Sequence, residues 1–563
     1  MSHNPFLSDW VKGGVNVSLS PPGSLSYVAG STDASLHFIT ISQLLDRTVQ
    51  RHGSRDAAIF VAQNQRLSWY DLQQQSDRMA ASLLALGVRR GNRVGIWAPN
   101  RLEWLLTQFA TARIGAVLVN INPAYKSHEL DYALNKVRCR VLVMARGHKS
   151  NHYLESLRQL APEIDRPGPV GDLTSLRLPH LKHVIVLDEL GKPAREAAAM
   201  PVPIRALRFS DFMQQAGPAQ HARLKGLCEA LDPDDAINIQ FTSGTTGHPK
   251  GATLSHFNIV NNARFAAKSM ALTHEDRLCI PVPLYHCFGM VLGVLTCTAV
   301  GAAMVFPGEG FDAAATLHAV RQQRCTALHG VPTMFVAMLA EPGVAQMDLG
   351  TLRTGIMAGA PCPVEKMEAV IRTLNMSQIT IGYGMTETSP LSFQSHVSDP
   401  LQRRVSTVGR ILPHVQAKVV DEHGRMVPVG VAGELCVRGY LVMRAYWEDP
   451  DQTAVAIDEA GWMHTGDLAT MDADGYCNIV GRIKDMVIRG GENIYPREIE
   501  EFLYRHPAIQ DVQVFGVPDQ RYGEELCAWI RLREGCQATE DELRNYCRGQ
   551  IATYKIPRYI RFS

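Results

Sequence analysis

The chain has 563 residues, enough for several domains that each bury a hydrophobic core. Its 56 basic and 55 acidic residues nearly balance, which argues against the basic surface of a nucleic-acid-binding protein and against a polybasic membrane patch. The 12 cysteines are scattered without a C-x-x-C pair. This spacing disfavours a zinc site and a disulfide framework, and it favours a cytoplasmic, reducing compartment.

Residues 1–40 are polar and rich in Ser, Gly and Pro, so we expect an irregular lead-in. The chain begins without a basic segment followed by an apolar core, and no signal peptide is predicted. The longest apolar stretch, residues 290–306, is short for a membrane span and is interrupted by Gly and Thr. It predicts a buried helix followed by a buried strand rather than a membrane anchor.

Residues 41–404 alternate helical patterns with short β-branched runs. Residues 67–86 carry apolar side chains at helical spacing, and residues 94–98, 117–121 and 141–144 predict buried strands. This alternation predicts stacked α/β layers in which helices cover both faces of a parallel sheet.

Two later changes of pattern predict two further units. Residues 405–484 carry short strands separated by turn sequences and predict a β-rich, barrel-like subdomain. The turn at 472–475 lacks the ligands of an EF-hand, so it predicts a hairpin. A helix opened by Pro496, two strands and a second helix predict a small α+β domain over residues 485–563.

The most informative segment is the loop at residues 241–251, which follows an apolar run. It contains three glycines, four hydroxyl residues and Lys250. Glycines let backbone N–H groups approach an anion, hydroxyls add donors, and the lysine adds a positive charge. The loop is suited to binding a polyphosphate, although Pro249 distinguishes it from a Walker A loop. The alternative, a flexible linker, is disfavoured by this lysine and proline.

Five motifs in this order resemble those of the adenylate-forming enzymes, which include acyl-CoA synthetases, luciferase-like enzymes and peptide-synthetase adenylation domains. The motifs are residues 242–251, 283–286, 382–388, 461–467, and 481–485 with 490–493. The resemblance covers roughly residues 40 to 563, and residues 399–409 and 412–414 are most similar to medium-chain fatty acyl-CoA synthetases. It implies that the chain uses ATP to convert a carboxylic acid into an acyl adenylate and then transfers the acyl group to coenzyme A.

The resemblance also implies which residues bind ATP and Mg²⁺. The β- and γ-phosphates are expected to be bound by the loop residues Thr242, Ser243, Gly244, Thr245, Thr246, Gly247 and Lys250. Glu387 helps to hold Mg²⁺, and a carboxylate is a suitable hard ligand for that ion. Thr386 donates a hydrogen bond to the α-phosphate. The plainer alternatives are a helix-cap glutamate and a turn threonine.

The nucleoside is assigned in the same way. Asp467 accepts hydrogen bonds from both ribose hydroxyls, and Arg482 reaches the ribose or a phosphate. Tyr383 lies on one face of the adenine, and the small residues Gly359, Ala360 and Pro361 form the opposite wall. The alternatives are a plain turn, a hinge salt bridge and ordinary core packing.

The acyl and coenzyme A sites follow from the resemblance too. His286 lies between the acyl pocket and the α-phosphate, and the pocket is lined by Tyr285, His286, Val331, Met357 and Met385. The small domain is mobile and rotates at Asp485 after adenylation, so that Gly490 and Gly491 face the pantetheine tunnel. A structural histidine, core methionines and a tight turn are the alternatives.

Family members continue past the position of Ser563 to a Gly-Lys pair whose lysine contacts the carboxylate and the α-phosphate, whereas Lys555 matches a different family lysine. We therefore expect this chain to bind ATP but to adenylate about 10² to 10³ more slowly, with the thioester step less affected. Two other functions stay open: an acyl-AMP ligase for a carrier protein, or luciferase-like monooxygenase, and a non-catalytic acyl or nucleotide sensor.

Overall fold

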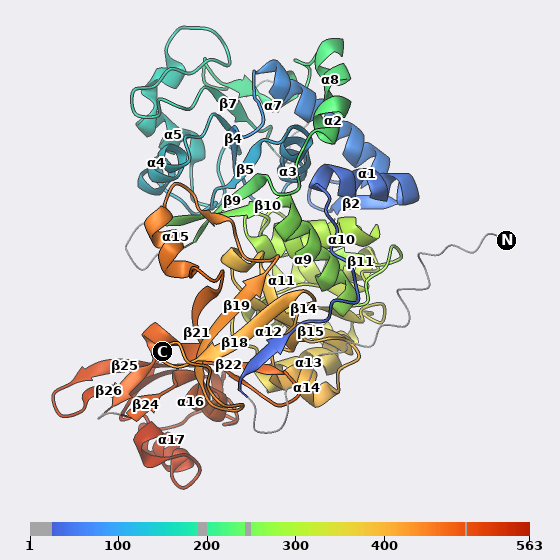
Figure 1. Ribbon diagram of the computed structural model, residues 1–563. Coiled ribbons are helices and arrows are strands. Elements are labelled where there is room, and N and C mark those ends of the chain that lie inside the picture. The colour runs from blue at the N-terminus through green and yellow to red at the C-terminus, as the bar shows by residue number, and fades with distance from the viewer. Residues whose placement is uncertain (1–24, 190–199, 243–248, 490–491) are drawn as a thin grey trace.

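The computed structural model describes residues 25–189, 200–242, 249–489 and 492–563 (Figure 1). It is a mixed α/β structure with four sheets. The two largest contain most of the parallel strands, the third is antiparallel, and the fourth lies in the C-terminal part of the chain. The expected fold class, stacked α/β layers followed by a β-rich unit and a small α+β unit, matches this arrangement.

The first sheet has eight strands, and all neighbours are parallel except those flanking β10. In sheet order the strands are β20 (Ala445–Tyr446), β10 (Lys250–Ser255), β9 (Ala236–Thr242), β5 (Val117–Asn120), β4 (Arg93–Trp97), β6 (Val141–Met144), β7 (His183–Val186) and β8 (Leu207–Arg208). Strands β4, β5 and β6 are buried along nearly their whole length, as the continuous apolar runs predict.

The second sheet has nine strands with a parallel centre and antiparallel strands at both edges. In sheet order they are β17 (Arg410–Ile411), β16 (Leu391–Gln394), β15 (Gln378–Gly384), β14 (Thr354–Ala358), β13 (Ala327–Leu328), β11 (Arg277–Cys279), β12 (Ala303–Phe306), β2 (Asp56–Phe60) and β3 (Gln65–Ser68). The expected buried helix and strand of residues 290–306 are a π-helix, η3 (Phe288–Leu295), then α10 (Thr296–Val300) and β12.

Helices fill the space between these two sheets. Helix α2 (Trp69–Ala85) packs on β2 and β3 of the second sheet and on α3 (Leu102–Ile114), which packs on β4 and β5 of the first. Helix α9 (His256–Ser269) likewise contacts β10 and β16. Ser68 and Ser255 begin α2 and α9 with capping boxes. One continuous core therefore joins the two sheets.

Further helices are α1 (Ile41–His52), α4 (Ser127–Lys136), α5 (Tyr153–Leu160), α7 (Phe209–Phe212), α8 (Pro218–Glu229), α11 (Ala313–Gln322), α12 (Pro332–Leu339), α13 (Val364–Leu374), α14 (Leu401–Ser406) and α15 (Pro450–Ala456). Of these, α1 packs on α2, α3, α9 and α10, and α8 packs on α2 and α3. None of the helices in the described ranges is long and apolar enough to cross a membrane.

The third sheet is antiparallel and contains β1 (Tyr27–Ala29), β18 (Val415–Val420), β19 (Gly433–Gly439), β21 (Met463–Met471) and β22 (Cys477–Arg482). The turn at 472–475 joins β21 to β22 as a hairpin, with the Gly475 N–H donating to the Asp472 carbonyl. Strand β1 comes from the segment expected to be an irregular lead-in. It pairs with β18, so residues 27–29 form regular structure with a distant strand (Figure 1).

The C-terminal elements form a small sheet with two helices. The strands are β23 (Val487–Arg489), β24 (Glu492–Ile494), β25 (Ile509–Asp519), β26 (Gly523–Leu532) and β27 (Tyr559–Phe562), and the helices are α16 (Pro496–Leu503) and α17 (Glu540–Cys547). They have their own core and lie at one end of the molecule, beside β22 (Figure 1). The domain boundaries at 404/405 and 484/485 stay predictions.

Candidate active site

The predicted site residues gather where three sheets meet. The parallel strands β11, β13, β14 and β15 are consecutive neighbours in the second sheet, and the segments that follow them carry His286, Val331, Gly359 and Glu387. Since the carboxyl ends of parallel strands share one edge of a sheet, these residues lie along the same edge, which is where ligands bind in α/β folds. Strands of the first and third sheets approach this edge from either side.

Glu387 lies at the contact between the first and second sheets. It belongs to a short 3₁₀ turn, Thr386–Thr388, directly after β15, and only 4% of its surface is exposed. Its Oε1 accepts a hydrogen bond of 2.9 Å from the Thr242 hydroxyl at the end of β9. The same oxygen accepts one of 2.9 Å from the Tyr446 hydroxyl of β20. Two hydroxyls from the first sheet therefore fix the orientation of this carboxylate.

The geometry of Glu387 suits a hard divalent cation. Both hydroxyls bond Oε1, and no described residue donates a hydrogen bond to Oε2. A buried carboxylate that is held through one oxygen can offer the other to an ion, and Mg²⁺ takes oxygen ligands of this kind. Burial and the Glu387 charge together raise the pKa of Tyr446, so that hydroxyl remains a hydrogen-bond donor.

Lys250 lies beside the same cluster. It is the first residue of β10, and its Nζ lies 5.0 Å from the centre of the Tyr446 ring, in a cation–π contact. This contact places the ammonium against the tyrosine whose hydroxyl bonds Glu387. Thr242 and Lys250 are paired across β9 and β10, so the two ends of the predicted phosphate loop are adjacent. The remaining predicted loop residues lie outside the described residues: Ser243, Gly244, Thr245, Thr246 and Gly247.

Asp467 lies at the contact between the second and third sheets. Its Oδ2 accepts a hydrogen bond of 2.7 Å from the Tyr383 hydroxyl of β15. Its Oδ1 lies 3.3 Å from the Nε of Arg482, its partner in the β21–β22 pairing. Burial raises the pKa of Asp467, while the Tyr383 hydroxyl and the Arg482 guanidinium act in the opposite direction. The structure thus brings together three residues that the sequence assigns to the nucleoside.

The predicted adenine wall is an open surface. Gly359, Ala360 and Pro361 follow β14 and are all exposed. Gly359 has a φ of +84°, a left-handed conformation that favours glycine. Ordinary core packing, the alternative considered above, therefore does not describe these three residues. Tyr383 reaches the same edge from the neighbouring strand β15.

His286 and Thr386 are connected through a cysteine. The Cys287 sulfur lies 3.6 Å from His286 Nδ1 and 3.7 Å from Thr386 Oγ1. His286 Nδ1 also accepts a hydrogen bond of 3.1 Å from the Phe288 N–H, so the proton of a neutral ring resides on Nε2. The neighbouring Cys287 raises the pKa of His286, while desolvation acts against it. His286 and Thr386 thus belong to one connected group.

The residues predicted for the acyl pocket differ in their exposure to solvent. Tyr285, Val331 and Met385 are half-buried and His286 is exposed, whereas Met357 in β14 is fully buried. The first four can therefore face a ligand at the sheet edge. The Tyr285 carbonyl accepts a hydrogen bond of 2.8 Å from Asn120, which fixes this segment to β5 of the first sheet.

The predicted hinge lies in a short 3₁₀ turn, Ile483–Asp485, between β22 and β23. Beyond it, the Arg497 guanidinium of α16 donates to the Ile479 carbonyl of β22 at 2.6 Å, which links the C-terminal elements to the third sheet. Lys555 bonds both oxygens of Glu498 at 2.7 Å, a contact inside the small domain. Gly490 and Gly491 lie outside the described residues.

Sequence analysis missed Tyr446 and Cys287. Tyr446 reaches Glu387 only because β20 pairs with the edge of β10, at a separation that no local pattern reveals. Cys287 is adjacent to His286, but nothing in the sequence indicates its contact with Thr386, 99 residues away.

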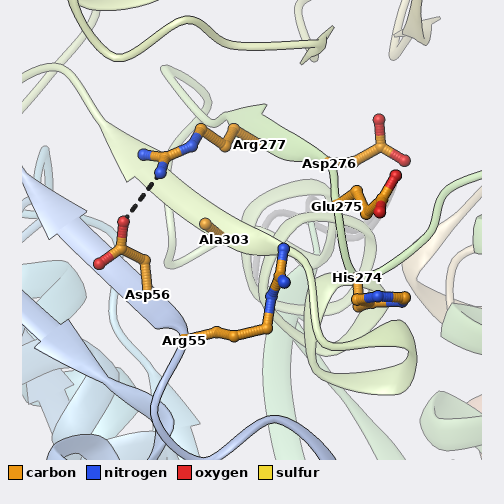
Figure 2. Close-up of a pocket in the computed structure, with 7 residues that line it drawn as sticks. All are labelled: Arg55, Asp56, His274, Glu275, Asp276, Arg277 and Ala303. Atoms are coloured by element: carbon orange, nitrogen blue, oxygen red, sulfur yellow. Dashed lines mark hydrogen bonds and ion pairs between the residues drawn. The ribbon is translucent and has the colours of Figure 1, made fainter.

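A separate pocket lies at the amino ends of parallel strands of the second sheet, on the side opposite to the candidate active site (Figure 2). Asp56, Arg277 and Ala303 begin the parallel strands β2, β11 and β12, so this pocket is at their amino ends. Figure 2 shows Arg277 paired with Asp56, at 3.0 Å, among further charged side chains of both signs. Because these charges offset one another and lie away from the ligand-binding edge, we do not assign the chemistry to this pocket.

Comparisons with known proteins agree with this geometry. Residues 45–447 match the family described as AMP-binding enzyme, and residues 498–563 match its C-terminal domain. The putative acyl-CoA synthetase YngI of Bacillus subtilis is 48% identical over 94% of both chains. The mitochondrial medium-chain acyl-CoA ligase ACSF2 of Danio rerio is 46% identical over 99% of this chain and 91% of its own.

Among solved structures, the anthranilate CoA ligase AuaEII in complex with anthranoyl-AMP superposes with a TM-score of 0.80, at 25% identity over 94% of both chains. At the level of the family, the predicted adenylate-forming acid–thiol ligase that uses ATP, Mg²⁺ and coenzyme A is confirmed. The chain belongs to the family of AMP-binding enzymes.

Proposed function

We propose that this chain joins a medium-chain carboxylic acid to coenzyme A through an acyl-AMP intermediate. The observation that carries the proposal is the buried Glu387 carboxylate. Two hydroxyls hold one of its oxygens and leave the other without a described donor, beside Lys250 and Thr386. Such a site handles a magnesium-bound polyphosphate. The medium-chain preference rests on the ACSF2 relatives and on the resemblance in the sequence.

In the first half-reaction, an oxygen of the acid's carboxylate attacks the α-phosphorus of ATP. The bond between that phosphorus and the bridging oxygen breaks, and pyrophosphate leaves. Both reactants are anions, so the residues of the site must neutralise charge and align the two groups. Glu387 would hold Mg²⁺, and the bound ion would supply positive charge to the phosphate oxygens. Lys250 adds a second positive charge, and Thr386 donates to the α-phosphate.

His286 completes the donor set. Because its Nδ1 accepts the Phe288 N–H, its Nε2–H is available to donate toward the acyl carboxylate or an α-phosphate oxygen. Asp467 and Tyr383 bind and orient the nucleoside, with the exposed wall at Gly359 as the other side of the adenine site. This arrangement sets the α-phosphorus between the nucleoside site and the acyl side of the cluster.

In the second half-reaction, the thiolate of coenzyme A attacks the acyl carbonyl carbon of the adenylate. The bond from that carbon to the phosphate oxygen breaks and AMP leaves, which yields the thioester. We propose that rotation of the small domain at Asp485 opens the path for the thiol. The 3₁₀ turn that contains Asp485 joins the third sheet to the C-terminal sheet, which supports this position for the hinge.

Product analysis tests the proposal. The protein is incubated with ATP, Mg²⁺, coenzyme A and acids from short to long chain, together with benzoate, and the products are identified by mass spectrometry. A parallel reaction supplies synthetic acyl-AMP and coenzyme A, which isolates the thioester step. We expect acyl-CoA in both, with a maximum at medium chain lengths. Acyl-AMP that accumulates and reacts only with a carrier-protein thiol would contradict the choice of coenzyme A.

A cytoplasmic location belongs to the same proposal. All 12 cysteines are free thiols, which supports a reducing compartment. The relatives include mitochondrial proteins and a bacterial one, so they do not choose between compartments. Fractionation of the source cells followed by immunodetection tests this location, and recovery in an organelle fraction would contradict it.

A further inference from the structure

Glu434 holds the turn that carries Asp467. It lies on β19, next to β21 in the third sheet, and its carboxylate is part-buried. Its Oε1 accepts a hydrogen bond of 3.2 Å from the Gly466 N–H. Its Oε2 lies 2.8 Å from the Nδ1 of His464. One carboxylate thus bonds a backbone amide and a side chain on the residues just before Asp467.

Hydrogen bonds of Thr465 also restrain the turn that carries Asp467. The Thr465 hydroxyl donates to the Leu435 carbonyl at 2.7 Å and accepts the Asp467 N–H at 3.1 Å. Between these anchors Gly466 has a φ of +69°, where glycine has conformational freedom and no side chain to limit it. The Glu434 contact is therefore the restraint that acts directly on the most flexible residue of the turn.

We propose that Glu434 is a positioning residue for the nucleotide, acting through Gly466 to aim the Asp467 carboxylate at the ribose. The inference rests on the proposed function, which assigns Asp467 to the ribose hydroxyls. Asp467 is already oriented on one side by Tyr383 at 2.7 Å. Glu434 supplies the restraint on the backbone side, and a hydrogen bond to a charged acceptor is stronger than one between neutral groups.

The trio Glu434, Cys436 and His464 also has ligand atoms within 4.8 Å of one another, as in a metal site. The chemistry favours hydrogen bonding. His464 Nδ1 lies 2.8 Å from Glu434 Oε2, the other Glu434 oxygen accepts the Gly466 N–H, and burial raises the pKa of Cys436 to about 12. A metal ligand must be the thiolate. The nearby Lys418 favours the thiolate, but its effect is smaller than that of burial.

The test measures binding affinity, so it does not depend on turnover. Calorimetry gives the Kd of ATP, 2′-deoxy-ATP and 3′-deoxy-ATP for the wild type, Glu434→Ala and Glu434→Gln. Glu422→Ala is the matched control, because Glu422 is highly exposed in the connection between β18 and β19. The glutamine variant keeps a carbonyl that can accept the Gly466 N–H.

In the wild type we expect ATP to bind more tightly than either deoxy analogue, because Asp467 accepts both ribose hydroxyls. Glu434→Ala should weaken ATP binding about five- to tenfold and weaken each analogue, which keeps one ribose hydroxyl, by less, so that the discrimination narrows. Glu434→Gln should retain most of the discrimination, and Glu422→Ala all of it.

The binding data distinguish a failure of the proposed role of Asp467 from a failure of the proposed role of Glu434. A wild type that binds ATP and the deoxy analogues equally would contradict the proposed role of Asp467 itself. A wild type that discriminates, together with an alanine variant that discriminates equally well, would overturn the role of Glu434. A uniform loss for all three nucleotides would also overturn it, in favour of a general effect on folding. Stoichiometric metal in the purified protein that Cys436→Ser removes, together with the discrimination, would replace it with a metal site.

Discussion

Glu387, which is buried, and Asp467, which is half-buried, are two carboxylates at two contacts between sheets, and a tyrosine hydroxyl bonds each of them. Glu387 accepts both of its described side-chain hydrogen bonds on one oxygen. Asp467 uses both oxygens, one for Tyr383 and one for the Arg482 guanidinium. In the described residues the first carboxylate has two neutral hydroxyl partners and no ion pair, whereas the second has a positive partner at 3.3 Å.

The difference indicates different tasks. A carboxylate without a cationic partner in the described chain is suited to bind an ion. A carboxylate beside an arginine is suited to accept hydrogen bonds from neutral groups, because its charge is already balanced. We therefore expect Glu387 to govern catalysis through magnesium, and Asp467 to govern nucleotide affinity.

The largest effect is expected for Glu387→Gln. Glutamine is nearly isosteric and still accepts the two hydroxyl hydrogen bonds, but it removes the charge that binds the ion. Acyl-CoA formation should fall by about 10² to 10³, the usual loss for one electrostatic group in an active site. Steady-state kinetics over a range of Mg²⁺ concentrations measures it.

The control for this variant is Glu422→Gln, a change at a highly exposed side chain in the connection between β18 and β19. It should leave the rate unchanged. A Glu387→Gln enzyme that keeps wild-type activity at all Mg²⁺ concentrations would remove the basis for the proposed function.

The next largest effect is expected for Asp467→Ala. Losing one hydrogen bond to a charged acceptor costs about 1.5–3 kcal/mol, so the loss of even one ribose contact should raise the Kd of ATP about 10- to 100-fold. The rate at saturating ATP should change much less, which is the opposite of the Glu387 result. Equilibrium binding and kcat measured on the same variant separate the two. A fall in kcat with an unchanged Kd would break the contrast between the two carboxylates.

Tyr446→Phe should have a smaller effect. It removes the hydroxyl that bonds Glu387 at 2.9 Å but keeps the aromatic ring beneath the Lys250 ammonium. One lost hydrogen bond of about 1 kcal/mol predicts a roughly fivefold lower rate and a higher requirement for Mg²⁺. Thr242→Val removes the other hydroxyl, and the double variant measures the coupling between them. Strictly additive effects would show that the two hydroxyls do not act through the same carboxylate.

The sequence predicted much of this arrangement because short motifs carry it. Glu387, Asp467 and Lys250 each lie in a local motif of the sequence, so their membership of one site could be predicted without distances, and their roles stay predictions. Strand β6 (Val141–Met144) was predicted with its observed bounds, since a short β-branched run buried on both faces has few alternatives.

Other features depend on contacts between distant segments. Strand β1 (Tyr27–Ala29) lies in polar, Gly-rich sequence and becomes a strand only because β18 offers an edge. The Tyr446 contact needs β20 to pair with β10, and the Gly466 contact needs Glu434 to lie opposite β21. The helix predicted within residues 290–306 was correct in kind, but its π-helical part depends on packing rather than on apolar periodicity.

The smallest effect is expected in the pH dependence of stability. Burial raises the pKa of Asp467 above its ordinary value of 3.8, against the influence of Tyr383 and Arg482. In the pH range between the unfolded and folded pKa values the native state binds more protons than the unfolded state, so stability decreases as pH rises through that range. Above the folded pKa the destabilisation is complete and constant.

Asp467→Asn should therefore raise the Tm at neutral pH, because it removes a buried charge while its carbonyl still accepts the Tyr383 hydroxyl. The gain should shrink as pH falls from the raised folded pKa toward 3.8 and disappear well below 3.8, where the wild-type carboxyl is protonated in both states. Thermal unfolding of the two proteins over the acid range measures this difference. A gain that is independent of pH would mean that packing, and not the buried charge, separates them. A loss at neutral pH would mean that the Arg482 pairing outweighs the cost of burial, so that Asp467 stabilises the fold as well as the nucleotide.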